Sequence, residues 1–148
     1  MIYDIESIIS KNNTRISWDE YFMSITLLAS CRSSCDRLHV GCVIVDDEHR
    51  IISVGYNGYL ANVRHKSRVR DGHEQSTVHA EQNAVAYAAK NGVSLNNTKA
   101  YISHYPCINC TKILIASGIK EILYHKDYKN DDICKDILND AKIKINKI

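Results

Sequence analysis

The sequence predicts an α/β fold with three layers, in which a five-stranded mixed sheet carries helices on both faces. A helix and a β-hairpin are expected first, and helices and strands then alternate along the chain, an order typical of a sheet covered by crossover helices. The length of 148 residues is typical of one domain. We therefore expect residues 1–148 to form a single domain, with residues 1–16 as an N-terminal extension.

The first elements have clear local signals. Ser17 and Glu20 are spaced as in a capping box, so a helix is expected over about Trp18–Arg32. Two runs rich in β-branched residues follow, Val40–Val45 and Ile51–Gly55, and a short polar segment joins them. This pattern predicts two antiparallel strands in a hairpin.

The middle of the chain combines a long polar segment with the strongest helix signal. Residues Tyr56–Thr77 show no periodicity, and a loop of this length is usually functional. Alanines at helical spacing predict a helix over Val78–Asn91, and Gly92 provides its stop signal.

The C-terminal part alternates strands and helices. A strand is expected over Ala100–Ser103, and Pro106 then begins a helix that Gly118 ends. The remaining elements are a strand, a helix and a strand, over Glu121–His125, Asp132–Ala141 and Lys142–Asn146. Right-handed crossovers would place the N-termini of the second and third predicted helices side by side at one edge of the sheet.

Charge and composition exclude several classes of partner. The 19 Lys and Arg residues nearly balance the 17 Asp and Glu residues, for a net charge of +2, so neither a nucleic-acid nor a membrane partner is expected. The N-terminus lacks the basic region of a signal peptide, and no apolar run approaches the roughly 18 residues of a membrane span. We expect a cytoplasmic protein, or one in the host cytosol if its source is a virus. Six cysteines in such a protein point to metal ligands or core thiols.

Two short motifs carry the chemistry. His79 and Glu81 form an H-x-E motif at the start of the alanine-rich helix, and Pro106, Cys107 and Cys110 form a P-C-x-x-C motif at the start of the next. Together they match the signature of zinc-dependent nucleobase deaminases. His79, Cys107 and Cys110 are the expected Zn²⁺ ligands, and three protein ligands leave a fourth position open, as in catalytic zinc sites. The alternative is a buried histidine, a solvated carboxylate and a redox or structural cysteine pair.

Glu81 is the expected catalytic residue. Zinc lowers the pKa of a bound water toward about 7, so hydroxide becomes available at neutral pH. Glu81 lies two residues from a ligand, and it can carry the proton of the water to the ring nitrogen and to the departing ammonia. The motifs therefore predict hydrolytic deamination.

Further segments resemble the deoxycytidylate (dCMP) deaminases of the cytidine deaminase superfamily, over about Ser17–Ile145. They are Ser17–Met23, Arg32-Ser33, Val40-Gly41, Gly55-Tyr56-Asn57-Gly58, His79–Ala84, Tyr105–Cys107 and Ser117–Glu121. The stretch from Asp71 to Asp131 is especially similar to the bacterial competence-operon form. The resemblance implies the three-layer α-β-α cytidine deaminase-like fold and a homo-oligomer, commonly a hexamer. It also implies conversion of dCMP to dUMP, which feeds thymidylate synthesis.

The resemblance further implies a set of substrate contacts. Asn57 corresponds to a residue that meets the base or the sugar, and Arg32, Ser33 and Tyr128 correspond to residues around the nucleotide and its phosphate. An arginine can bind phosphate through two parallel hydrogen bonds, which suits Arg32 to that role. Tyr105 is expected to pack either against the bound base or in the core.

One departure from the family pattern concerns regulation. Relatives often follow Gly-Tyr-Asn-Gly with a Pro and a Gly, in a loop associated with activation by dCTP and inhibition by dTTP, with Mg²⁺ on the triphosphate. This chain has Tyr59-Leu60-Ala61-Asn62 instead, and loss of the glycine changes the freedom of the backbone. We expect effector control to be weakened or absent, and Mg²⁺ only with a bound triphosphate effector.

A second departure concerns a structural zinc site that many relatives build from cysteines and a histidine. Cys35 and His73 match two of its positions, but Lys66 and Glu74 stand where the competence-operon form has cysteines. An ammonium cannot ligate zinc. A remodelled site would use Cys35, His65, His73 and Glu74, but we expect one zinc per chain.

Other activities stay open as alternatives. The enzyme could act on dCTP as well as or instead of dCMP. A tRNA adenosine deaminase shares both zinc motifs, but it lacks the Gly-Tyr-Asn-Gly element and needs a broad basic surface. A zinc-stabilised interaction module would keep the metal without needing Glu81, so a Glu81→Gln substitution separates it from an enzyme.

Overall fold

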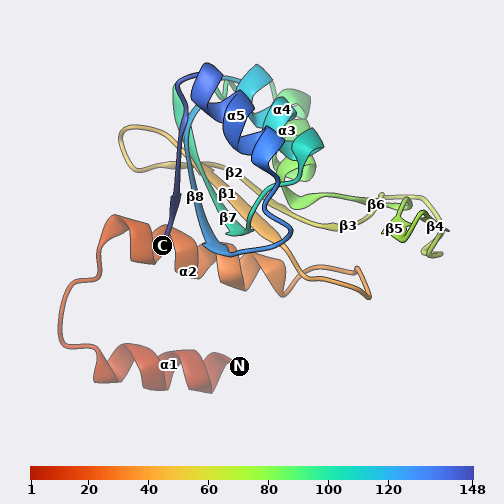
Figure 1. The fold of residues 1–148 in the computed structure, drawn as a ribbon. Helices are drawn as coiled ribbons and strands as arrows, with labels where there is room; N and C mark the ends of the chain where they lie inside the picture. The colour runs from red at the N-terminus through yellow and green to blue at the C-terminus, as the bar shows by residue number, and fades with distance from the viewer.

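The computed structural model describes residues 1–148, and a five-stranded mixed sheet forms its centre (Figure 1). The strands are β1 (Gly41–Val45), β2 (Ile51–Tyr56), β7 (Thr98–His104), β8 (Ile119–Lys126) and β9 (Lys144–Lys147). Their order across the sheet is β2-β1-β7-β8-β9. Strand β1 is antiparallel to β2 and β7, whereas β7, β8 and β9 run parallel to one another. The predicted sheet and its hairpin are confirmed.

Helices cover both faces of this sheet. The helices are α1 (Ile2–Lys11), α2 (Trp18–Ser30), α3 (Ala80–Lys90), α4 (Ile108–Ala116) and α5 (Asp132–Asp140). Helix α2 covers one face, and α3, α4 and α5 cover the other (Figure 1). The predicted three-layer arrangement is therefore confirmed. None of the helices is both long enough and apolar enough to cross a membrane.

Each face of the sheet has its own apolar core. On the α2 face, Phe22 and Met23 pack with Val43, Tyr101 and Leu123. The opposite face has the larger core, in which small alanines of α3 let the helix lie close to the strands. Its buried members are Cys42, Ile44, Ala80, Ala84, Ala88, Leu95, Ala100, Ile102, Leu114, Ile119, Ile122 and Leu138. Successive side chains of β1 point to opposite faces, so this strand serves both cores.

A glycine allows α3 to approach strand β2 closely. A Cβ atom added at Gly55 would lie 2.2 Å from the carbonyl oxygen of Ala80 and 2.6 Å from the backbone nitrogen of Ala84. Ser53, on the same strand, donates its hydroxyl to the Ala84 carbonyl at 2.7 Å. The first turn of α3 is therefore fixed against the sheet by direct backbone contact.

The start of α2 has the predicted capping box. The Ser17 hydroxyl accepts a hydrogen bond from the Glu20 amide at 3.2 Å, and the Glu20 carboxylate accepts one from the Ser17 amide at 2.8 Å. These contacts satisfy two backbone donors that a helix start leaves free. The helix ends at Ser30, and the predicted end at Arg32 falls in the turn that follows it.

The segment between β2 and α3 is more regular than a loop. Its four short strands form two antiparallel pairs, β3 (Gly58–Tyr59) with β6 (Thr77–Val78) and β4 (Val69–Arg70) with β5 (His73–Glu74). Asp71 and Gly72 connect β4 to β5 with φ angles of 51° and 74°, which suits a type I′ hairpin turn. The expectation of a loop without regular structure was wrong here, because the Asp-Gly pair is itself a hairpin signal.

The Glu74 carboxylate holds this segment together. It accepts hydrogen bonds from the Ser67 hydroxyl, from the Arg68 amide at 3.1 Å and from the Ser76 amide at 2.8 Å. Hydrogen bonding, chiefly from Ser67, lowers the pKa of Glu74 to about 2. A single ionised side chain thus joins both ends of the β4–β5 hairpin.

Residues 2–11 form helix α1, which the sequence analysis did not predict. None of its residues is buried. The helix lies apart from the sheet, and α2 separates the two (Figure 1).

Candidate active site

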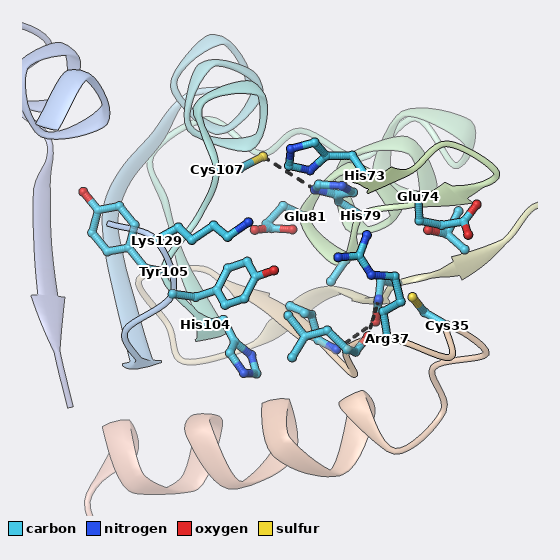
Figure 2. Close-up of a pocket in the computed structure, with 16 residues that line it drawn as sticks. Cys35, Arg37, His73, Glu74, His79, Glu81, His104, Tyr105, Cys107 and Lys129 are labelled. Atoms are coloured by element: carbon cyan, nitrogen blue, oxygen red, sulfur yellow. Dashed lines mark hydrogen bonds between the residues drawn. The ribbon is translucent and has the colours of Figure 1, made fainter. Parts of the chain in front are cut away.

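The two sequence motifs meet where α3 and α4 begin. His79 is the capping residue of α3, and Cys107 is the capping residue of α4. The Nδ1 atom of His79 lies 3.6 Å from the Cys107 sulfur (Figure 2) and 3.3 Å from the Cys110 sulfur. Right-handed crossovers place two helix N-termini side by side, and here this brings the three side chains together.

These three side chains have the donor set of a zinc site. Their ligand atoms all lie within 4.8 Å of one another, and no other group of three or more His, Cys, Asp or Glu side chains does so. Two sulfurs and one imidazole nitrogen suit Zn²⁺, and three protein ligands are typical of a catalytic zinc. The arrangement therefore fits the metal that the motifs predict.

The thiols are poised for metal binding. A hydrogen bond from Cys110, together with one from His79, lowers the pKa of Cys107 to about 4. The pKa of Cys110 moves in the opposite direction, because this thiol donates to Cys107 and is buried. One thiolate is thus already available at neutral pH, and the thiolate is the form that binds metal.

Glu81 lies in the first turn of α3, beside the three ligands. Its side chain is only 4% exposed, and this burial raises the pKa of its carboxyl group. A raised pKa suits a group that must both accept and release a proton near neutral pH. Figure 2 shows the carboxylate directed into the pocket beside His79.

A pocket of about 260 Å³ opens in front of these residues. Three of the predicted substrate residues line it, namely Asn57, Tyr105 and Tyr128. His79, Glu81 and Cys107 contribute to the same wall (Figure 2). Two of the predicted metal ligands, His79 and Cys107, therefore share one cavity with the predicted catalytic residue and part of the predicted substrate site.

Asn57 is 7% exposed, and its amide is already bonded to the backbone. The Oδ1 atom accepts from the Val40 amide at 2.7 Å, and the Nδ2 atom donates to the Leu38 carbonyl at 2.6 Å. Each group keeps capacity for one more hydrogen bond. Asn57 therefore fixes the chain that enters β1 and still presents polar atoms to the pocket.

Two tyrosines, Tyr105 and Tyr128, line the pocket. Tyr105 packs edge-on against Tyr124, with ring centroids 5.1 Å apart, and its hydroxyl points toward the pocket centre (Figure 2). Tyr128 packs edge-on against His104 at 6.1 Å. The rings thus form a fixed apolar surface on which a nucleobase could lie.

Arg32 and Ser33 are not among the residues that line the pocket. Arg32 is exposed just after α2, and the Ser33 hydroxyl accepts a hydrogen bond from the Cys35 amide at 3.2 Å. Ser33 therefore shapes the turn after α2 in this chain.

The residues considered for a second zinc are spread over the same region. Cys35, His73 and Glu74 line the pocket, whereas His65 stacks on Tyr59 with ring centroids 4.8 Å apart. The Glu74 carboxylate is engaged by the hydrogen bonds described above. These residues do not form a second cluster of three close ligand atoms.

The pocket also contains residues that the sequence analysis missed. Arg37, His104 and Lys129 line it, and Lys129 extends toward Glu81 (Figure 2). Lys129 follows the carboxyl end of the parallel strand β8, where ligands of α/β sheets commonly bind, and this position was an available signal. No comparable signal marks Arg37, which is held by a hydrogen bond to the Gly72 carbonyl.

Comparison with known proteins agrees with this site. Residues 16–126 match the family described as cytidine and deoxycytidylate deaminase zinc-binding region. ComE operon protein 2 of Bacillus subtilis is 39% identical over an alignment of 138 residues, and the match covers 90% of this chain and 72% of that protein. The deoxycytidylate deaminase of Homo sapiens is 32% identical, over 82% of this chain and 71% of that protein. That of Saccharomyces cerevisiae is 38% identical over 88% of this chain, which spans only 45% of the yeast protein.

Solved structures show the same fold. The dCMP deaminase of cyanophage S-TIM5, in complex with dCMP and dUMP, superposes with a TM-score of 0.80 at 28% identity, over 92% of this chain and 100% of that one. A tRNA:A34 deaminase superposes with a TM-score of 0.54 at 20% identity, over 76% of this chain and 79% of that one, and this likeness concerns the fold alone. The sequence matches, the fold and the His-Cys-Cys cluster agree, and the chain belongs to the cytidine and deoxycytidylate deaminase family.

Proposed function

We propose that this chain catalyses the zinc-dependent hydrolytic deamination of dCMP to dUMP, with release of ammonia. The observation that carries the proposal is the convergence of His79, Cys107 and Cys110 at a pocket that a buried Glu81 also lines. The relative from cyanophage S-TIM5, whose structure holds dCMP and dUMP, supports this choice of substrate. In a cell, the reaction would feed dUMP into thymidylate synthesis.

One zinc per chain would be held by the Nδ1 atom of His79 and the sulfurs of Cys107 and Cys110. When bound, zinc supplies the Lewis acidity that makes water a nucleophile at neutral pH. The thiolate of Cys107, favoured by the hydrogen bonds it receives, prepares the chain to bind the cation.

Glu81 moves the protons of the reaction. Its carboxylate accepts a proton from the attacking water while the new bond forms at C4 of the cytosine ring. It delivers this proton to the ring nitrogen N3. The carboxylate then takes the proton of the new C4 hydroxyl and passes it to the amino nitrogen, so that the C4–N bond breaks, ammonia leaves and the C4 carbonyl of dUMP forms. Burial favours the protonated carboxyl group, so the acid form is accessible during this exchange.

Substrate binding is assigned to the residues around this centre. We propose that Asn57 contacts the base or the sugar and that Tyr105 and Tyr128 pack against the nucleotide. Lys129 and Arg37 are cations of the pocket wall, which suits them to the 5′-phosphate.

The predicted phosphate contacts of Arg32 and Ser33 would require these residues to turn toward the ligand. Neither lines the pocket in this chain.

Self-association and effector binding complete the proposal. We propose that the enzyme is cytoplasmic and forms a homo-oligomer. The resemblance described above implies that this oligomer is commonly a hexamer.

The loop at residues 59–62 lacks glycine and proline, and Asn62 adopts a φ angle of 64° there. We propose that control by dCTP and dTTP, and with it any Mg²⁺, is weakened or absent. A sigmoidal dCMP rate curve that dCTP makes hyperbolic would contradict this.

An ammonia-release assay tests the proposed activity directly. The zinc-loaded protein is given dCMP, CMP, dCTP, deoxycytidine and single-stranded DNA in parallel, with zinc content measured on the same sample. We expect dCMP to react fastest. If dCTP or another compound reacts and dCMP does not, the substrate is wrong but the chemistry stands. If none of these compounds reacts, and Glu81→Gln changes neither the zinc content nor the fold, the chain is a zinc-stabilised interaction module.

A further inference from the structure

Helix α1 presents an apolar stripe that nothing in the chain covers. Ile2, Ile5, Ile8 and Ile9 follow helical spacing and lie on one face. Three of them, Ile2, Ile8 and Ile9, are 78%, 68% and 67% exposed. A continuous exposed apolar surface of this kind is typical of an interaction site.

The length of α1 also indicates a missing partner. The helix has 10 residues and buries none of them. Isolated helices shorter than about 12–15 residues are marginal in water, because packing of the apolar face supplies most of their stability. A surface that accepts the isoleucine stripe would therefore stabilise the helix.

A groove of about 780 Å³ at the start of α2 offers such a surface. It lies between α2 and the turn from β1 to β2, and its apolar lining includes Ile16, Trp18, Tyr21 and Ile51, each at least 40% exposed. Trp18 is held in place by stacking, with ring centroids 4.5 Å from His49 and 5.6 Å from Phe22. A rigid aromatic floor suits the binding of branched aliphatic side chains.

The charges of the two surfaces are complementary. Asp4 and Glu6 flank the isoleucine stripe, one on each side of it, by their helical spacing. Arg15 and Arg50 lie at the groove, and both are exposed. An acidic rim on the helix thus complements a basic rim on the groove, and such complementarity orients an interface.

The groove of each chain is poorly placed to bind the α1 helix of that same chain. In Figure 1, α2 lies between α1 and the turn that joins β1 to β2. Arg15, Ile16 and Ser17 already line the groove, so only residues 12–14 remain to reverse the chain, and these reach about 10 Å. A second copy has no such restriction.

We propose that α1 of one copy docks its isoleucine stripe into the α2 groove of a second copy, so that two chains exchange their N-terminal helices. In a two-fold arrangement each copy gives one helix and receives one, and the apolar contact is made twice. This inference rests on the proposed homo-oligomer and not on the proposed chemistry.

The mass of the zinc-loaded full chain in solution, measured by sedimentation, tests the proposal. We expect the wild type to associate and Ile5→Asp to lower the mass at least twofold. Ser7→Asp is the matched control, because it adds the same charge on the opposite face of α1 and is expected to leave the mass unchanged. Arg50→Glu reverses the rim charge without touching α1 and is expected to weaken association as well.

Zinc content and circular dichroism verify that each variant is folded. A monomeric wild type, or a folded Ile5→Asp variant with the wild-type mass, overturns the proposal.

A photo-cross-link identifies the occupant of the groove. Ile9→p-benzoylphenylalanine is expected to give a product of two chains, joined between residue 9 and the groove segments 15–22 or 49–51. A product within one chain, or a two-chain product elsewhere, overturns the proposal. Deaminase activity is recorded on the same samples. A wild type that associates through this contact but does not deaminate supports the interface and refutes the proposed function, so the two failures are distinguishable.

Discussion

The close approach of α3 to β2 makes Gly55→Ala a severe substitution despite its small size. The added Cβ would lie 2.2 Å from the carbonyl oxygen of Ala80, whereas ordinary contact begins at 3.4 Å, so the start of α3 must move by about 1.2 Å. Overpacking of this kind costs about 1–3 kcal/mol of folding free energy. His79 and Glu81 flank Ala80, so the same movement displaces a proposed zinc ligand and the proposed catalytic carboxylate. A misplacement of about 1 Å can cost about 100-fold in rate.

Thermal unfolding, bound zinc and kcat/KM for dCMP measure the consequences of Gly55→Ala. We expect a lower Tm and a rate loss of about 100-fold. Gly92→Ala is the control at the other end of α3, where the added atom meets nothing within 4 Å and the φ angle is 66°. That variant should lose stability through backbone strain while keeping its zinc and its rate. A Gly55→Ala protein with wild-type zinc content and rate would refute a positioning role for this contact.

Three further predictions test the site and the fold. Glu81→Gln should lower kcat by about 10²–10⁴-fold while atomic absorption finds the same zinc, and a parallel loss of zinc would indicate a structural role instead. Lys129→Met should raise KM for dCMP more than KM for deoxycytidine, which lacks the phosphate. Arg32→Met is the matched change outside the pocket, and equal effects of both would contradict the assignment of the phosphate to Lys129. Ser17→Ala should lower the free energy of unfolding in urea by about 1 kcal/mol at an unchanged rate, and an unchanged midpoint would show that the cap is unimportant.

Elements with local signals were predictable from the sequence. The capping box at Ser17 and Glu20 located the start of α2, because the side chains that cap a helix start bond to backbone groups within one turn. The active-site cluster was predictable for a related reason. His79 and Cys107 each begin a helix, and the handedness of crossovers brings such helix starts together.

Other features depend on contacts that no local pattern encodes. The positions of Arg32 and Lys129 are an example, since both follow the end of an element, yet only Lys129 lines the pocket. Which one reaches the cavity is decided by the direction of the connecting chain in three dimensions. The Asp71-Gly72 turn of the β4–β5 hairpin has a local signal, but the joining of the two hairpin ends depends likewise on Glu74 and its partners several residues away.

Strand β9 leaves one edge of the central sheet open, and its composition bears on how the protein behaves at high concentration. An open edge can be extended by a strand from another molecule, which is a common route to aggregation. β9 has only four residues and both begins and ends with lysine, and Lys147 is held by an ion pair with Asp127. An incoming strand would have to align with this charged and very short edge. Disordered association through this edge of the sheet is thereby disfavoured.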